Sequence, residues 1–341
     1  MAVVSFRLGG TDGVSIEAAK WVAALRQLEH DVITIAGSGV ADRLVPGLRA
    51  DATSPPSPKE LAEVLRPFDL VIVENLASLP LNVAAREVLY EVLAERDVLF
   101  HHHDLAWQRP HLAHLAGPRD EPGWRHVTIN DLSRRELLQR GIEATTIYNR
   151  FDCSPPLGRR DEARRALGIS DERLVVLPTR AIPRKNVAGA LALCEQLDAV
   201  LWIMGPAEDG YGDELETLLD ASTVRVVRLL PDAITMSDAY AGADLVVMPS
   251  TWEGFGNPVL ESVTHRRPLA LNPYPVAREI TSFGFGFFDL HDVASINHFL
   301  QHPDEGMFES NLEIAREHFN VAELPARLRE LLARSVASGD D

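Results

Sequence analysis

The stretch DLVVMPSTWEGFGNPVLESV at residues 244–263 decides the fold. It starts with a short apolar run rich in β-branched residues, passes through a glycine-containing loop, and continues with apolar residues at helical spacing. In this loop Asn257 is a suitable N-cap, and Pro258 suits the first helical position. A strand, a tight loop and a helix together form the repeating unit of a parallel α/β sheet.

The same alternation runs through most of the chain. In the first half, strands are predicted at 3–8, 31–37, 69–75, 98–104, 125–131 and 144–149, with amphipathic helices at 16–28 and 83–93. The pattern breaks at NRFDCSPPLG (149–158), and a second series of strands starts at residue 174. We therefore predict an α/β protein with two doubly wound, Rossmann-like domains that face one another across a cleft.

The predicted N-terminal domain covers 1–152 and the predicted C-terminal domain covers 153–320. Residues 321–341 are predicted to form a final helix that packs back on the N-terminal domain. Ligands of such sheets bind outside the carboxyl ends of the strands, so the residues that follow each strand are the ones to search for chemistry.

Composition excludes several classes of function. The net charge of −17 argues against non-specific binding to nucleic acid or anionic lipid, because both favour basic surfaces. The two cysteines show no disulfide or metal-binding spacing. The sequence has neither an apolar stretch of about 18 residues nor a secretory leader pattern. We expect a cytoplasmic protein without stable membrane insertion or a nucleic-acid partner; its oligomeric state is not indicated.

A basic pair follows the first strand of the second domain. In TRAIPRKN (179–186), Arg180 and Lys185 are five positions apart across a proline-containing turn. Such a turn can bring a bidentate guanidinium and a mobile ammonium onto neighbouring oxygens of a diphosphate. Lys185 is one of three lysines in a chain with thirty arginines, which makes its place in this loop more informative.

The glycine-containing loop carries two carboxylates, Glu253 and Glu261. Free backbone amides at the start of the following helix can bind phosphate. A carboxylate can accept hydrogen bonds from both hydroxyls of a vicinal diol, such as that of ribose or of a hexose.

Two features of the first half are weaker. Gly9 and Gly10 follow the first strand and precede a helix, so an anion could bind there, although a tight turn explains them equally well. The strand VLFHHHD (98–104) ends in three histidines. Strand alternation sends His101 and His103 to one face and His102 to the other, so the three cannot share one metal ion, and no companion carboxylate at recognisable spacing is evident. A hydrogen bond from His103 to a sugar hydroxyl is the functional alternative to a structural role.

Taken together, these motifs resemble the retaining, GT-B-fold glycosyltransferases of family 4, also called group 1, in which a Glu-x7-Glu signature follows a Pro-Ser strand end. The resemblance rests on Gly9-Gly10, His103-Asp104, NRFD (149–152), TRAIPRKN (179–186) and Glu253 to Glu261, in the family's order.

The resemblance implies roles for these residues. Arg180 and Lys185 would hold the donor diphosphate, Glu261 the nucleotide ribose, and Glu253 the hydroxyls of the transferred sugar. The residues expected to carry catalysis are Arg180, Lys185, Glu253 and His103. Donor binding is assigned to Gly10, Arg180, Lys185, Glu253, Gly254, Phe255, Gly256, Asn257 and Glu261. The acceptor side is assigned to Gly9, Gly10, Asp12, His103 and Asp104.

The expected function is retaining transfer of a hexose from a nucleoside diphosphate sugar, of the UDP or GDP type, to a hydroxyl of a soluble acceptor, without a metal or other cofactor. Two alternatives remain open on these residues. One is a sugar-nucleotide epimerase or hydrolase of the same fold, and the other is a non-catalytic nucleotide-sugar-binding protein.

Overall fold

A computed structural model describes residues 1–228 and 231–333 of the chain. The chain divides into two compact units. Unit 1 is formed by Met1–Arg150 together with the segment that starts at Val321, and unit 2 is Phe151–Asn320. The boundary lies two residues before the one expected from the sequence.

Unit 1 contains a parallel sheet with the strand order β3-β2-β1-β4-β5-β6-β7. Its strands are β1 (Ala2–Leu8), β2 (Ile33–Gly39), β3 (Arg43–Leu44), β4 (Leu70–Glu74), β5 (Asp97–His102), β6 (Trp124–Thr128) and β7 (Thr145–Thr146). Its helices are α1 (Gly13–Gln27), α2 (Pro58–Leu65), α3 (Val83–Leu93), α4 (Asp131–Leu138) and α13 (Leu324–Ala333), with short 3₁₀ turns η1 (Pro46–Leu48), η2 (Ala106–Gln108) and η4 (Val321–Glu323).

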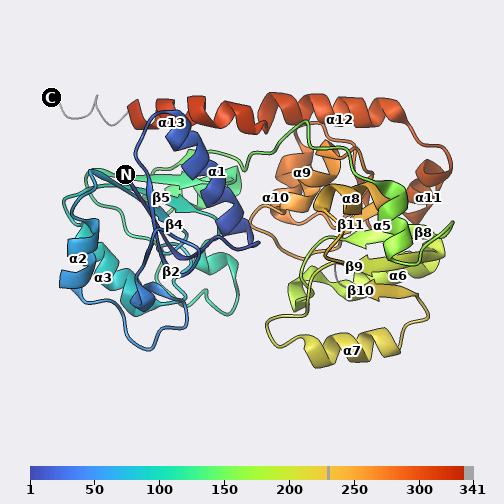
Figure 1. Ribbon diagram of the computed structural model, residues 1–341, viewed down its shortest axis with the longest axis horizontal. Helices are drawn as coiled ribbons and strands as arrows, with labels where there is room; N and C mark the ends of the chain where they lie inside the picture. Colours follow the sequence, from blue (N-terminus) through green and yellow to red (C-terminus); the bar gives the residue numbers. More distant parts are fainter. Residues whose placement is uncertain (229–230, 334–341) are drawn as a thin grey trace. The chain divides into compact units, whose positions relative to one another are not determined.

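Strand alternation divides the apolar side chains of this sheet between two cores. Val4 and Val73 belong to the core that α2 and α3 cover. Val3 and Ile72 point to the opposite face, where α1 and α13 cover them (Figure 1). The C-terminal helix α13 therefore completes the N-terminal unit, because its leucines fill the same core as those of α1.

Unit 2 contains a second parallel sheet with the strand order β10-β9-β8-β11-β12-β13. Its strands are β8 (Arg173–Leu177), β9 (Ala199–Ile203), β10 (Val226–Arg228), β11 (Leu245–Met248), β12 (Leu269–Leu271) and β13 (Phe288–Asp289). Its helices are α5 (Arg160–Ala166), η3 (Pro183–Lys185), α6 (Val187–Leu197), α7 (Gly212–Asp220), α8 (Met236–Gly242), α9 (Asn257–Thr264), α10 (Pro275–Thr281), α11 (Val293–Gln301) and α12 (Glu305–His318).

In this unit α6, α7 and α11 contribute to one core on a single face of the sheet. In both sheets the strand order reverses at the first strand, so that β1 lies beside β4 and β8 lies beside β11. Ligands of doubly wound sheets bind at this reversal, where the loops that follow the two neighbouring strands diverge.

The prediction of two doubly wound α/β domains is confirmed, and every predicted strand has a counterpart. Residues 334–341 of the predicted final helix lie outside the described residues. The prediction of Asn257 as an N-cap is wrong, because Gly256 occupies that position and Asn257 is the first residue of α9.

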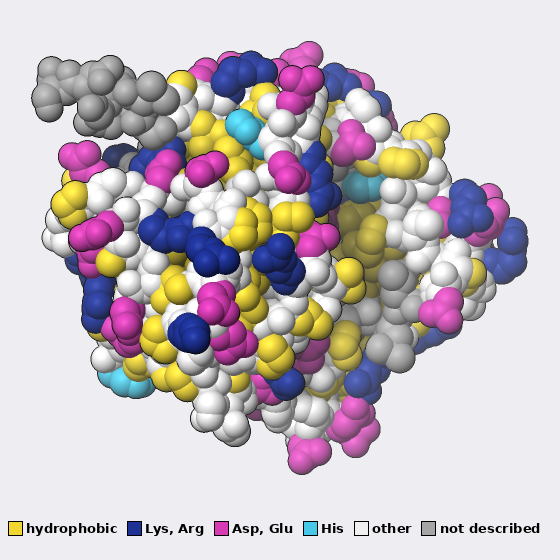
Figure 2. Space-filling view, turned by 60° about the vertical axis from the view of Figure 1, so that its left-hand side comes forward, with side chains coloured by type: hydrophobic (Ala, Val, Ile, Leu, Met, Phe, Trp, Pro, Cys, Tyr) yellow, Lys and Arg dark blue, Asp and Glu magenta, His cyan; other side chains and the backbone are white. Residues whose placement is uncertain are grey.

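Figure 2 shows acidic and basic side chains interspersed over the face in view, as suits a chain rich in both arginine and carboxylates. Among the helices of residues 1–228 and 231–333, none combines the length and the apolar character that crossing a membrane requires.

Candidate functional site

The candidate donor site lies at the strand reversal of unit 2. The loop after β8 contains Arg180 and η3, and the loop after β11 contains Glu253 and leads into α9. Since β8 and β11 are hydrogen-bonded neighbours, the two loops meet at the carboxyl edge of the sheet. The hydrogen bond from the Thr251 amide to the Arg184 carbonyl, 2.9 Å long, joins them directly.

A buried cluster of charges connects the loops. The ammonium of Lys185 donates to Glu253 Oε1, and Arg184 Nη1 donates to Glu253 Oε2 over 2.5 Å. Lys185 and Glu253 are 7% and 5% exposed. Burial by itself would raise the pKa of Glu253, but the charges of Lys185 and Arg184 outweigh it and hold that pKa at about 2. The carboxylate is therefore ionised, although it is excluded from water.

Burial has the opposite consequence for the lysine. Burial lowers the pKa of Lys185 below its usual value. The carboxylate of Glu253 opposes this decrease, and the nearby guanidinium of Arg184 adds to it. With its ammonium N–H groups as donors and one carboxylate oxygen as a printed partner, Lys185 retains donor capacity for further oxygens.

Arg180 has a partner that the sequence did not indicate. Its Nη1 donates to Glu208 Oε2 over 2.5 Å, and both side chains are partly exposed. Its positive charge also lowers the pKa of Lys185, so the two cations lie within electrostatic reach. Arg184, which shares Glu253 with Lys185, was not among the predicted site residues. Its position inside the same PRK turn was the available signal.

The start of α9 depends on a glycine. Gly256 adopts φ = +89°, and a Cβ atom there would lie 2.3 Å from Tyr274 Oη. That hydroxyl donates to the carbonyl of Phe255 over 3.0 Å, which holds the loop in place. The N-cap residue Gly256 has no side chain with which to cap α9. The first turn of α9 carries the partial positive charge of a helix N-terminus.

Glu261 lies in the second turn of α9 and accepts a hydrogen bond from Tyr240 Oη over 2.6 Å. Tyr240 is fully buried and stacks on His265, with ring centroids 4.6 Å apart. Burial and the charge of Glu261 raise the pKa of Tyr240 well above its usual value, so it remains a hydrogen-bond donor. Tyr240 comes from α8, and no local sequence motif indicated it.

In unit 1, the glycine loop after β1 is a tight turn. Gly9 has φ = +71°, and a Cβ there would lie 2.6 Å from Val40 Cβ. Asp12 caps α1 by accepting from the Ser15 amide at 3.1 Å, and it pairs with Arg7 at 3.0 Å. Gly10 is exposed beside them.

The three histidines separate as strand alternation predicts. His102 bonds to His126 over 2.9 Å, whereas His101 Nδ1 and His103 Nε2 approach Glu74 Oε2 at 2.9 and 2.7 Å. A carboxylate does accompany two of them, at a spacing that the sequence does not reveal: the ligand atoms of Glu74, at the end of β4, and of both rings lie within 4.8 Å of one another. It escaped detection because 27 residues separate it from His101 and parallel pairing alone brings them together.

The contacts of His101 Nδ1 and His103 Nε2 with Glu74 Oε2 have the lengths of hydrogen bonds, and both rings bond to this one oxygen. Asp104 pairs with Arg109 over 2.8 Å, and the amides of His103 and Asp104 both donate to Asn75 Oδ1 over 3.0 Å.

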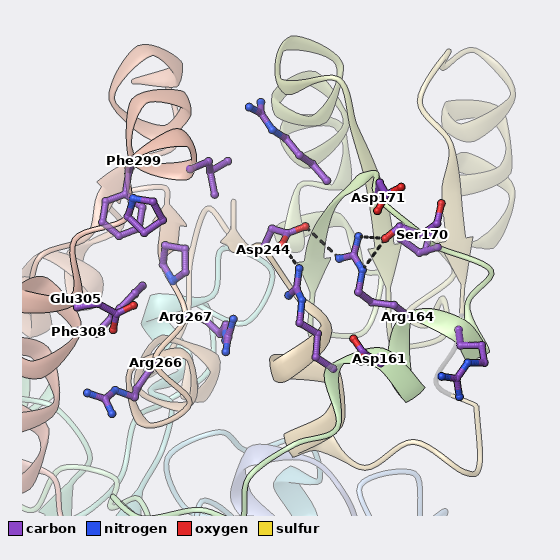
Figure 3. A pocket seen from close by; sticks show the side chains of 17 residues that line it. Asp161, Arg164, Ser170, Asp171, Asp244, Arg266, Arg267, Phe299, Glu305 and Phe308 are labelled. Atoms are coloured by element: carbon purple, nitrogen blue, oxygen red, sulfur yellow. Dashed lines mark hydrogen bonds and ion pairs between the residues drawn. The ribbon is translucent and has the colours of Figure 1, made fainter.

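A cavity of about 990 Å³ in unit 2 is separate from this chemistry. Figure 3 shows it among the amino ends of the strands, where Arg164 donates to Ser170 and Asp244. Arg160 also pairs with Asp244, over 2.5 Å. These arginines tie α5 to the residues that precede β8 and β11, so the contacts stabilise the edge of the sheet opposite the candidate site.

Residues 179–287 match the family model described as glycosyl transferases group 1, and this range contains every residue of the candidate donor site. The mannosylglucosylglycerate synthase of Thermotoga maritima is 25% identical to this chain, and the alignment covers 98% of this chain and 99% of the relative. These similarities identify the chain as a glycosyltransferase. A second mannosylglucosylglycerate synthase, from Petrotoga mobilis, is also 25% identical over 99% of this chain and 97% of its own.

Solved structures show that this glycosyltransferase has the GT-B fold. HepE of Anabaena, determined with UDP-glucose, has a TM-score of 0.74 at 16% identity, with 98% of this chain and 100% of that chain covered. Sucrose-phosphate synthase of Thermosynechococcus elongatus has a TM-score of 0.72 at 15% identity, with 99% of each chain covered.

Proposed function

We propose that this glycosyltransferase moves a hexose from a nucleoside diphosphate sugar to a hydroxyl of a soluble acceptor, with retention at the anomeric carbon and without a metal ion. The observation that carries the proposal is the buried contact between Lys185 and Glu253, in the loops that lead to the N-terminus of α9. A buried cation next to a helix N-terminus suits a diphosphate, and a buried carboxylate suits sugar hydroxyls.

In the proposed reaction, the bond between the anomeric carbon and the diphosphate oxygen breaks, and a bond from that carbon to the acceptor oxygen forms. Negative charge grows on the leaving diphosphate, where Lys185, Arg180 and the start of α9 stabilise it. A leaving-group oxygen takes the proton of the acceptor hydroxyl on the same face of the sugar. This route needs no protein base.

Glu253 and Glu261 then have distinct tasks. Glu253 is fixed by two cations and retains oxygen lone pairs for hydroxyls of the transferred sugar. Glu261 accepts hydrogen bonds from ribose hydroxyls while the buried Tyr240 holds its other side.

The identity of the sugars is proposed from the relatives. Their name describes a product that contains mannosyl, glucosyl and glycerate groups, so a mannosyl donor and a glucosylglycerate acceptor are the first substrates to test.

The test combines binding with product analysis. UDP- and GDP-sugars are screened by thermal shift, since a donor at 100 times its Kd stabilises a protein by about 2.7 kcal/mol. The stabilising donor is then incubated with glucosylglycerate and other hydroxyl compounds, and NMR defines the anomeric configuration of the product. A retained glycoside supports the proposal. An inverted product, hydrolysis or epimerisation regardless of acceptor, or binding without turnover contradicts it.

A further inference from the structure

Glu74 occupies an unusual position for a carboxylate. It ends β4 in register with His101 on β5, it is completely buried, and two histidine rings converge on its Oε2. Burial would raise the pKa of Glu74, but His101 and His103 lower it to about 2. Near neutral pH the group is therefore an ionised acceptor.

An ionised carboxylate accepts hydrogen bonds and donates none, so each ring nitrogen that faces it carries a proton. His103 faces Glu74 with Nε2, and His101 faces it with Nδ1. In its neutral form an imidazole bears one proton, and two neutral rings that face Glu74 in this way are held in opposite tautomers. The Nδ1 atom of His103 is then a hydrogen-bond acceptor, and no group in residues 1–228 and 231–333 bonds to it.

The surrounding residues fix this arrangement in space. His101 stacks on Trp21, with ring centroids 4.1 Å apart. Asn75 adopts a left-handed backbone conformation, with φ = +59°, and its side chain binds the amide of His103. Both features restrict movement of the two rings relative to Glu74.

The arrangement also has a cost in stability. Glu74 Oε1 and His101 Nε2 are buried without a hydrogen-bond partner in the described part of the chain. Such atoms lose the hydrogen bonds that water gives them in the unfolded chain. Such atoms also occur elsewhere in the described chain, but here two of them belong to one contact between a carboxylate and an imidazole.

We infer that Glu74 is a positioning residue that holds His103 in its Nε2–H tautomer, so that Nδ1 accepts a hydrogen bond from a hydroxyl of a bound sugar. The inference rests on the proposed function, because it needs a sugar substrate beside His103. Glu74 itself is buried behind the ring and acts through it.

The tautomer can be read in the unaltered protein. With selectively ¹⁵N-labelled histidine, His103 should show a protonated Nε2 and an unprotonated Nδ1 at pH 7.5, and His101 the reverse. The signals are assigned by their loss in His103→Asn. A protonated Nδ1 on His103, alone or in a doubly protonated ring, overturns the inference, whether or not a donor has been identified.

Kinetics then test the connection between the two residues. Glu74→Ala and His103→Ala should each lower kcat/KM for the acceptor by about 10-fold, the loss of one hydrogen bond, while the Kd of the donor nucleotide stays unchanged. The double variant should be no slower than His103→Ala, because residues that act as one unit are not additive. Glu91→Gln, at an exposed position on α3, serves as the control for loss of a carboxylate.

Additive losses in the double variant would show that Glu74 acts independently of His103, which overturns the inference. If the wild-type enzyme transfers no sugar, the proposed function fails, and the NMR result still decides the tautomer. If Glu74→Ala does not fold, Glu74→Gln takes its place in the same cycle.

Discussion

Replacing Lys185 by methionine tests the proposed donor site most directly. Methionine has a similar length and no charge, so it fills the buried space of a side chain that is 7% exposed while removing the ammonium. Glu253 keeps its 2.5 Å contact with Arg184, so the carboxylate is not left unpaired. The loss of folding stability should therefore stay below the roughly 3–5 kcal/mol that an unpaired buried charge costs.

The effect on turnover should be larger. At roughly 4 Å and an effective dielectric constant of about 20, a unit charge attracts a phosphate oxygen by about 4 kcal/mol. Loss of one preorganised donor at a developing negative charge lowers kcat by about 10²–10³-fold. We expect Lys185→Met to lower kcat by about 10²-fold or more.

The assay measures initial rates of nucleoside diphosphate release and of glycoside formation under saturating donor and acceptor, with the melting temperature recorded for each variant. Lys59→Met is the matched control, because Lys59 is exposed on α2 in the other unit. Near-normal turnover in a folded Lys185→Met protein would refute the electrostatic role. An equal loss in Lys59→Met would show that the effect is not specific to the site.

Three further outcomes are expected. Gly256→Ala should destabilise the protein and weaken donor binding, because the added methyl group would collide with Tyr274. Gly210→Ala is the control: Gly210 has φ = +75° and no atom within 4 Å of the added methyl group, so this variant should lose only the roughly 1–2 kcal/mol of backbone strain. Equal melting temperatures for the two variants would contradict this prediction. Because the pKa values of Glu253 and Glu74 are lowered to about 2 from 4.5, their contribution to stability is complete above pH 4.5 and is lost as the pH falls toward 2. Urea unfolding should then show a decrease of up to about 3 kcal/mol for each group between pH 5 and pH 2, and an unchanged free energy of unfolding at the acid end would argue against it. Activity should persist in EDTA, measured after dialysis; a loss that added Mg²⁺ or Mn²⁺ restores would contradict metal-independent transfer.

The strands and helices of this chain could be predicted from local sequence, because strands and helices differ in the spacing of their apolar residues. The apolar run at 245–248 and the glycine loop after it became β11 and the turn into α9. The N-cap residue of α9 could not be predicted, because both Gly256 and Asn257 are suitable cap residues. The contact of Gly256 with Tyr274 decides between them. Tyr274 lies 18 residues further along the chain, so no local rule includes it.

The candidate donor site could be predicted in part for the same reason. Lys185 and Glu253 belong to sequence motifs, and each was identified on its own. That they form a buried pair was decided by the crossover that places β11 beside β8, since 68 residues separate them. The partner of Arg180 was unpredictable because Glu208 lies after β9, in a loop without a motif.

The sequence by itself determined the two α/β series, their strand order in the chain and the residue types that follow the strands, because these depend on local periodicity and on turn chemistry. The tertiary structure decided the partners: Arg184 with Glu253, Tyr240 with Glu261, and Glu74 with two histidines. Hydrogen bonds and ion pairs between side chains depend on atoms a few ångströms apart. Parallel pairing and the reversal of strand order create that proximity between residues far apart in sequence, and no local pattern records it.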